Sequence, residues 1–159
     1  KDVEVEVVSI EKKALADRKL YEEKTVSGME FLERNSILRA KQQVIEQAID
    51  KARESIAGLN DEEYFNVLEK LLRKNVQQGK GKICFSKKDL DRIPNGFEDR
   101  VKEIVAENQG ELVIDKEPAN IKDGFVLVYG EIEENCTLKA LFDSNIDRIK
   151  DIANKQLFG

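Results

Sequence analysis

The stretch LRAKQQVIEQAIDKARESI, residues 38–56, decides how this chain is organised. Its apolar side chains recur at Leu38, Ile45, Ile49 and Ile56, separated by seven, four and seven residues, with charged residues between them. That spacing follows the helical period of about 3.6 residues and not the period of two that a strand shows. The stretch therefore predicts an amphipathic α-helix.

The same stripe continues toward the N-terminus. Spacings of three, four or seven residues lead back to Ile10, and no proline occurs before Pro94. A helix of about 45 residues would reach about 70 Å, more than twice the width of a small domain. Such a helix cannot bury its apolar side within its own chain, so the pattern predicts pairing with a helix of another chain. The predicted seam comprises Ile10, Ala14, Tyr21, Thr25, Gly28, Leu32, Asn35 and Leu38.

Two alternatives remain open in this first third. The opening KDVEVEVVSI alternates like a strand at Val3, Val5 and Val7, although Val3, Val7 and Ile10 also continue the helical stripe, which favours helix. Ser27-Gly28 is a possible break, at which the helix would fold back on itself as a hairpin.

Gly58 ends this pattern, and a compact domain is predicted after it. Asn60 is a candidate N-cap with Glu63 three residues later, and Gly79 is a candidate C-terminal glycine for the helix between them. The predicted division is therefore a partner-pairing helix over residues 1–57 and a globular α/β domain over 58–159.

The globular part alternates between strands and helices. The apolar runs predict strands at 82–86, 111–115 and 124–130, with a helix over 97–107 between the first two. A strand-helix-strand unit of this length predicts a parallel pair. The fold class is therefore α+β: a long N-terminal helix, then a compact domain with a small three- to four-stranded mixed sheet packed on helices.

A final helix is predicted to the end of the chain, capped by Asn135 or Thr137. We expect Leu157-Phe158 to plug the core of its own domain, in preference to direct contact with a partner. The predicted core comprises Tyr64, Leu68, Leu71, Leu72, Leu138, Phe142, Leu157 and Phe158.

Composition limits the function classes. The 159 residues carry a net charge of −5, which disfavours general nucleic-acid binding. No apolar run is long enough for direct membrane insertion, and no secretory leader is evident, so we expect a cytoplasmic chain. Because the sequence begins at Lys1 and not at a methionine, we expect that residues of the natural product precede it. Cys84 and Cys136 are interpreted as small core hydrophobes and not as a disulfide.

Catalytic equipment is not apparent in the sequence. There is no histidine, so the commonest general base and metal ligand are missing, and we expect no catalytic, metal or cofactor site. QGKGKICFS pairs glycines with lysines but places them before a strand, whereas a phosphate-binding loop follows one. Lys80, Lys82, Lys87 and Lys88 are interpreted as a solvated surface, with a docking patch for an acidic partner as the alternative.

The order of motifs resembles the E subunit of V-type and A-type rotary ATPases over residues 30–159. LRAKQQVIEQAIDKARESI is similar to the exit of the family's long helix, and YFNVLEKLL to its Tyr-x-x-x-Leu-x-x-Leu-Leu helix at Tyr64, Leu68, Leu71 and Leu72. IKDGFVLVYGEIEENCTLKALF is similar to its final strand and helix, and ANKQLFG to its ending.

The resemblance implies a non-catalytic peripheral-stalk (stator) subunit, peripherally associated with the membrane through the ATPase complex. It implies a heterodimer with the G-type (H-type in archaea) subunit through the N-terminal helix, and contact with the catalytic head, the A/B-type subunits, through the C-terminal domain. The alternatives are a generic coiled-coil adaptor outside the ATPase, then a small enzyme, then an RNA-binding module.

Overall fold

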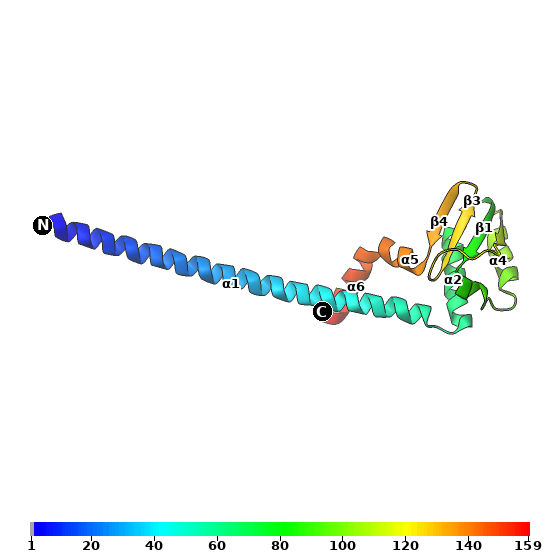
Figure 1. Cartoon of the computed structure of the whole chain (residues 1–159), viewed down its shortest axis with the longest axis horizontal. Coiled ribbons are helices and arrows are strands. Elements are labelled where there is room, and N and C mark those ends of the chain that lie inside the picture. Colours follow the sequence, from blue (N-terminus) through cyan, green and yellow to red (C-terminus); the bar gives the residue numbers. More distant parts are fainter. Residues whose placement is uncertain (1) are drawn as a thin grey trace. The chain divides into compact units, whose positions relative to one another are not determined.

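The chain opens on one long helix. A computed structural model describes residues 2–159, and in it α1 (Asp2–Ala57) passes through Gly28 without interruption (Figure 1). The helical interpretation of the opening stretch is therefore confirmed, and the alternative of a hairpin at Gly28 is wrong. A glycine inside a helix costs about 1 kcal/mol relative to alanine, which one position in so long a helix tolerates. The helix ends where predicted, since the Gly58 N–H donates to the Glu54 carbonyl at 2.9 Å.

The chain divides into two compact units, residues 1–45 and 46–159. The second unit includes the last turns of α1, where Ile49 is buried and Ile56 packs against the core. The division proposed from sequence, at residue 57, concerned which residues pair with a partner and stays a prediction.

The first helix of the globular unit is α2 (Asp61–Asn75), and Asn60 caps it as predicted. The Asn60 Oδ1 accepts from the Glu63 N–H at 2.9 Å. The prediction that this helix ends at Gly79 is wrong, because α2 already stops at Asn75. Gly79, which has φ +96°, begins the first strand instead.

The sheet has four strands in the order β2-β1-β3-β4 (Figure 1). They are β1 (Gly79–Phe85), β2 (Gly110–Ile114), β3 (Phe125–Tyr129) and β4 (Ile132–Cys136). β1 and β2 are parallel, as the strand-helix-strand unit predicted, whereas β3 is antiparallel to both β1 and β4. The predicted α+β class with a small mixed sheet is confirmed.

Two helices make the crossover from β1 to β2. The first is the single turn α3 (Lys87–Leu90), capped by Ser86, whose Oγ accepts from the Asp89 N–H at 3.1 Å. The second is α4 (Phe97–Ala106), within one residue of its predicted end. Gly96 precedes α4 at φ +81°, a left-handed conformation that glycine adopts without a steric penalty.

The fourth strand and the helices after it differ from the prediction. Asn135, a candidate helix cap, lies in β4, and Thr137 is the cap, with its Oγ1 accepting from the Ala140 N–H at 3.1 Å. The predicted single final helix is two helices, α5 (Leu138–Ser144) and α6 (Ile146–Phe158). They are separated at Asn145, whose side chain donates to the Leu141 carbonyl at 2.9 Å and so competes with helical continuation.

The core lies between one face of the sheet and helices α2 and α4. Phe65, Phe85 and Phe97 pack edge to face or tilted, with ring centroids 4.8–6.3 Å apart, and Phe125 packs edge to face on Phe85 at 5.9 Å. Of the predicted core, the following residues are buried: Tyr64, Leu68, Leu71, Leu72, Leu138 and Phe142.

Leu157 and Phe158 are the exceptions to the predicted core. They are 46% and 41% exposed, and α6 contains no buried residue. Their placement in the core of the domain is therefore corrected. Because the chain breaks at Asn145, α6 does not continue the direction in which α5 buries Leu138 and Phe142.

Candidate functional site

A buried polar network surrounds Asp89 in the globular unit, and it is fully hydrogen-bonded. The Tyr64 hydroxyl donates to Asp89 Oδ2 at 3.0 Å and accepts from the Gly124 N–H at 2.8 Å. Arg92 donates to Asp89 Oδ1 at 2.9 and 3.0 Å, and its guanidinium lies 4.1 Å from the centroid of the Tyr64 ring. This network joins α2, α3 and the start of β3.

The network has no free group with which to carry out chemistry. Across residues 2–159, every buried side-chain nitrogen and oxygen has a hydrogen-bond partner. Burial is the main cause that raises the pKa of Tyr64, with the Asp89 charge adding to it, so the hydroxyl stays protonated. A protonated hydroxyl held between a fixed acceptor and a fixed donor is a structural brace, and we assign it that role.

The described part of the chain shows neither a metal-binding cluster nor a thiol with a lowered pKa. No group of three or more acidic or cysteine side chains there could hold a metal ion. Burial raises the pKa of the Cys136 thiol to about 12, and burial together with Asp115 raises the pKa of the Cys84 thiol. Thiols are nucleophilic as thiolates, so the raised pKa values disfavour reaction of either cysteine at neutral pH.

The lysines near β1 are largely neutralised. Lys80 pairs with Glu111 at 3.0 Å, and Lys82 with Asp115 at 3.4 Å, on the sheet face away from the helices. The Glu117 N–H is the main cause that lowers the pKa of Asp115, with Lys82 contributing. These pairs favour the solvated-surface interpretation of the lysine cluster over a basic docking patch.

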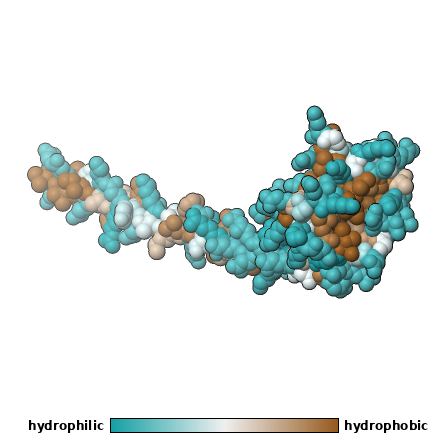
Figure 2. All heavy atoms as spheres, turned by 45° about the vertical axis from the view of Figure 1, so that its right-hand side comes forward, coloured by the Kyte–Doolittle hydropathy of each residue, from teal (hydrophilic) through white to brown (hydrophobic). Residues whose placement is uncertain are grey.

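Most of the exposed large apolar side chains among residues 2–159 lie on α1. Between residues 3 and 38 its apolar side chains are exposed, including Tyr21 at 72%, Leu32 at 67% and Phe31 at 62%. Figure 2 shows these hydrophobic groups at intervals along the helix, separated by hydrophilic ones. A monomer seldom leaves so many large apolar side chains in water, so this surface is the candidate functional site.

The helix places most of the predicted seam on one face. Ile10, Tyr21 and Leu32 are eleven residues apart, three helical turns, so their side chains project within about 40° of one another. Ala14 and Thr25 lie on the same face, because they follow Ile10 and Tyr21 by one turn.

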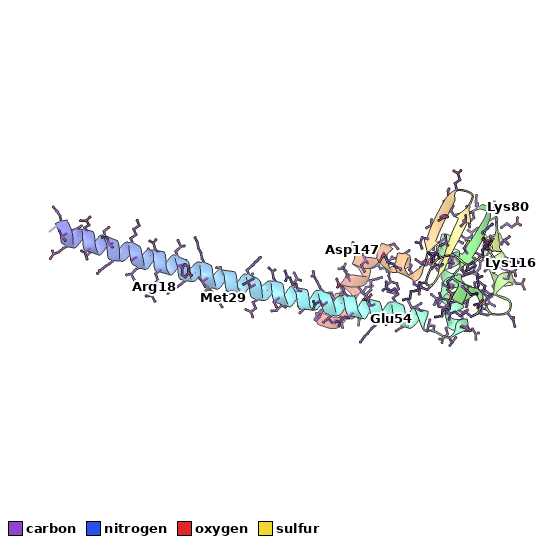
Figure 3. All side chains as sticks on the ribbon, viewed as in Figure 1. Arg18, Met29, Glu54, Lys80, Lys116 and Asp147 are labelled. Carbon is purple, nitrogen blue, oxygen red and sulfur yellow. The ribbon has the colours of Figure 1, made fainter. Side chains whose placement is uncertain are left out.

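Met29 belongs to this face although the sequence analysis did not name it. It follows Thr25 by four residues and precedes Leu32 by three, and it is 67% exposed. Figure 3 shows Met29 projecting from the same side of α1 as Arg18, eleven residues earlier. The signal that identifies it is the eleven-residue repeat.

Leu38 lies on a different face from the first part of the predicted seam. Six residues separate it from Leu32, which rotates its direction by about 120° on a helix. It belongs with Phe31 and Ile45, which precede and follow it by seven residues. We call the face that Ile10, Tyr21 and Leu32 share the first face. Gly28 lies at its edge, and Asn35 lies beyond that edge. Because apolar residues occur on several faces, no single direction of α1 is strongly apolar.

Residues 2–159 contain no helix with the length and apolarity needed to cross a membrane. The chain combines a long helix whose apolar side chains are uncovered with a small α+β domain whose buried polar side-chain atoms all have hydrogen-bond partners. These features define a class of protein: a subunit that assembles with other chains.

The family is shown by comparison with known proteins. The family model of the ATP synthase (E/31 kDa) subunit matches residues 3–158, and the chain belongs to this family. The chain is therefore an E subunit of the V-type ATP synthase group, which the sequence resemblance predicted. Membership also removes the support for a generic adaptor outside the ATPase.

Individual relatives agree. The chain is 30% identical over 138 residues to the V-type ATP synthase E subunit of Clostridium botulinum strain Langeland, covering 86% of this chain and 69% of the relative. It is 30% identical over 126 residues to a V-type ATP synthase E subunit of Clostridium tetani, covering 79% and 64%. It is 28% identical over 103 residues to the V-type ATP synthase E subunit of Acetivibrio thermocellus, covering 64% and 52%.

Proposed function

We propose that this chain is a non-catalytic peripheral-stalk subunit that holds the catalytic head of a rotary ATPase against rotation. The observation that carries the proposal is α1, whose exposed apolar side chains have no cover within residues 2–45 of its own unit. Each such side chain gains about 1.5–3 kcal/mol when it is fully buried, so the helix gains most from a helical partner along its length.

The partner in this proposal is the G-type (H-type) stalk subunit, paired with α1 as a heterodimer. The spacing of the first face supports a coiled coil of eleven-residue period. Eleven residues in three turns is about 3.67 residues per turn, slightly more than a free helix has, and this favours a right-handed winding. Ala14, Thr25 and Gly28 are small, which lets the two backbones approach closely.

The C-terminal domain in this proposal attaches the stalk to the A/B-type subunits of the head. Its packed aromatic core and hydrogen-bonded brace support this role, because an attachment point must keep its shape under torque. The helix suits the transmission of force, since its backbone hydrogen bonds run along its axis and do not expose a sheet edge. The chain would then be cytoplasmic and peripheral to the membrane.

The proposal is tested by mixing the full chain with the G-type subunit of the same organism. We expect a one-to-one complex in sedimentation, and a circular dichroism signal at 222 nm that exceeds the sum of the two separate chains. The double variant Tyr21→Ser, Leu32→Ser removes two anchors of the first face and should weaken the complex.

A matched control carries the same type of change on a different face of α1, at Leu20→Ser and Val26→Ser. It should bind more tightly than the seam variant. If the wild-type chains sediment separately and their signals simply add, the stalk proposal is wrong.

A further inference from the structure

We propose that the helix that pairs with α1 carries basic side chains along both edges of its contact face, because acidic side chains border the contact face of α1. This inference rests on the proposed function, which supplies a helical partner. It adds the chemistry that selects that partner and rejects a second copy of this chain.

The contact face is the first face extended back to Val3. It repeats every eleven residues with the spacing four, three, four. Its members between residues 3 and 32 are mostly apolar or small, and five of its large apolar side chains are more than half exposed: Val3, Ile10, Tyr21, Met29 and Leu32. Eleven residues in three turns correspond to about 98° per residue, so the face runs nearly parallel to the helix axis. The repeat consists of Val3, Val7, Ile10, then Ala14, Arg18, Tyr21, then Thr25, Met29, Leu32.

One edge of the face is occupied by glutamate at every repeat. Glu11, Glu22 and Glu33 are eleven residues apart and lie about 65° from the midline of the face. In a coiled coil, residues at this angle sit beside the contact and meet the edge residues of the partner.

The other edge is acidic as well. Glu6 and Asp17 lie about 65° from the midline on the opposite side, and the next position of that row is Gly28. Five carboxylates therefore border the face between residues 6 and 33, and these two rows hold no lysine or arginine in that segment.

The lysines of the same segment lie away from the contact face. Lys13 and Lys24 project about 100° from the midline, and Lys12 and Lys19 project still further round the helix. The segregation leaves the two edges negative although lysines are present in the same turns.

Within the described residues, four of the five edge carboxylates have no ion pair. Only Glu22 is paired, with Arg18 at 3.1 Å. Glu6, Glu11, Asp17 and Glu33 therefore meet a partner as uncompensated charges. A second copy of this chain would oppose carboxylates to carboxylates in either direction of the helices. A helix with lysine or arginine at its edges would gain an attractive charge pair at each of these positions. Charge therefore discriminates between the two pairings.

The experiment measures binding of the full chain to the G-type subunit of the same organism by titration calorimetry, at about 50 mM and about 500 mM NaCl. The edge variant is Glu11→Lys, Glu33→Lys. The control variant, Glu23→Lys, Glu30→Lys, makes the same change in net charge on the side of α1 that faces away from the contact. Circular dichroism of each variant alone checks that α1 is equally helical.

We expect the edge variant to bind about tenfold more weakly than wild type at low salt, since each reversed exposed pair contributes modestly. The difference should shrink at high salt, where charges beyond about 4 Å are screened. The control should remain within about twofold of wild type, in the range of surface changes away from a contact.

The outcomes separate the two proposals. If wild type binds and the edge and control variants weaken binding equally, the acidic-edge inference is overturned and the stalk function stands. If wild type itself does not bind the G-type subunit, the stalk function fails, and the inference fails with it. Self-association of wild type as strong as its binding to the G-type subunit would also contradict the inference.

Discussion

Replacing Tyr64 by phenylalanine removes one oxygen atom from the interior of the globular unit. The ring stays in place, but Asp89 Oδ2 loses a donor at 3.0 Å and the Gly124 N–H loses an acceptor at 2.8 Å. Both groups are buried, with Asp89 only 1% exposed, so water cannot replace the hydroxyl without rearrangement.

The magnitude follows from the two orphaned groups. A buried polar group left without a partner costs about 1–3 kcal/mol. Arg92 still binds the other carboxylate oxygen, so the aspartate keeps part of its compensation. We therefore expect Tyr64→Phe to lower the free energy of unfolding of the globular unit by about 3 kcal/mol.

The assay is urea unfolding of the full chain followed by near-ultraviolet circular dichroism, which reports the aromatic core and not α1. With a slope of about 1.5 kcal/mol per molar urea, the midpoint should fall by about 2 M. Tyr21→Phe makes the same chemical change at an exposed position of α1 and should leave the free energy of unfolding unchanged within about 0.5 kcal/mol. If Tyr64→Phe and Tyr21→Phe have equal midpoints, the brace contributes nothing and the argument is refuted.

Three further changes test other parts of the structure. Gly124→Ala should destabilise the unit by more than about 2 kcal/mol in the same urea assay, because Gly124 has φ +74° and an added Cβ would lie 2.6 Å from the Cys136 carbonyl oxygen. A wild-type midpoint for this variant would contradict the close approach. At pH 8 Cys136, whose pKa is about 12, should react slowly with an aromatic disulfide reagent in the folded chain and quickly in urea. The contribution of this thiol to the free energy of unfolding is present below its unfolded pKa and is lost as the pH rises toward 12. Fast labelling of Cys136 in the folded chain would show that the thiol is accessible. Leu157→Ser and Phe158→Ser should each change the free energy of unfolding by less than about 1 kcal/mol, since both side chains are substantially exposed, and a loss comparable to a core truncation would restore the plug hypothesis.

The features that the sequence predicted well are those set by local spacing. The long helix follows from a period that persists through α1, and the start of α2 follows from a capping side chain at Asn60 with Glu63 in the same turn. The parallel pairing of β1 and β2 follows from the handedness and length of the crossover.

Features set by contacts between distant residues were not predictable in this way. β4 has the sequence IEENC, whose glutamates and asparagine disfavour strands, and it is extended because β3 pairs with it along its whole length. Gly79 carries the signature of a helix end, but its register with Gly110 makes it the start of β1. The exposure of Leu157 and Phe158 depends on the break at Asn145, and a helical pattern alone does not show such a break.

The candidate site was predictable in the part that local spacing along the helix sets. Ile10, Tyr21 and Leu32 share a face because their spacing is a whole number of turns, and that spacing is present in the sequence. Leu38 was grouped with them because each single step of the stripe looks helical, whereas the two steps of three residues from Leu32 through Asn35 to Leu38 together rotate the direction by about 120°. Met29 and the acidic edges become apparent only when the eleven-residue repeat is laid onto α1.

The strand order β2-β1-β3-β4 also constrains how this domain can fold while it is being synthesised. β1 is synthesised first yet lies in the interior of the sheet, and both of its neighbours, β2 and β3, emerge later. The nascent chain therefore leaves β1 unpaired until Gly110–Ile114 has left the exit tunnel, and one edge of β1 stays open until Phe125–Tyr129 has followed. During that interval α1 is already synthesised, so its exposed apolar side chains are accessible before the domain that follows it can close.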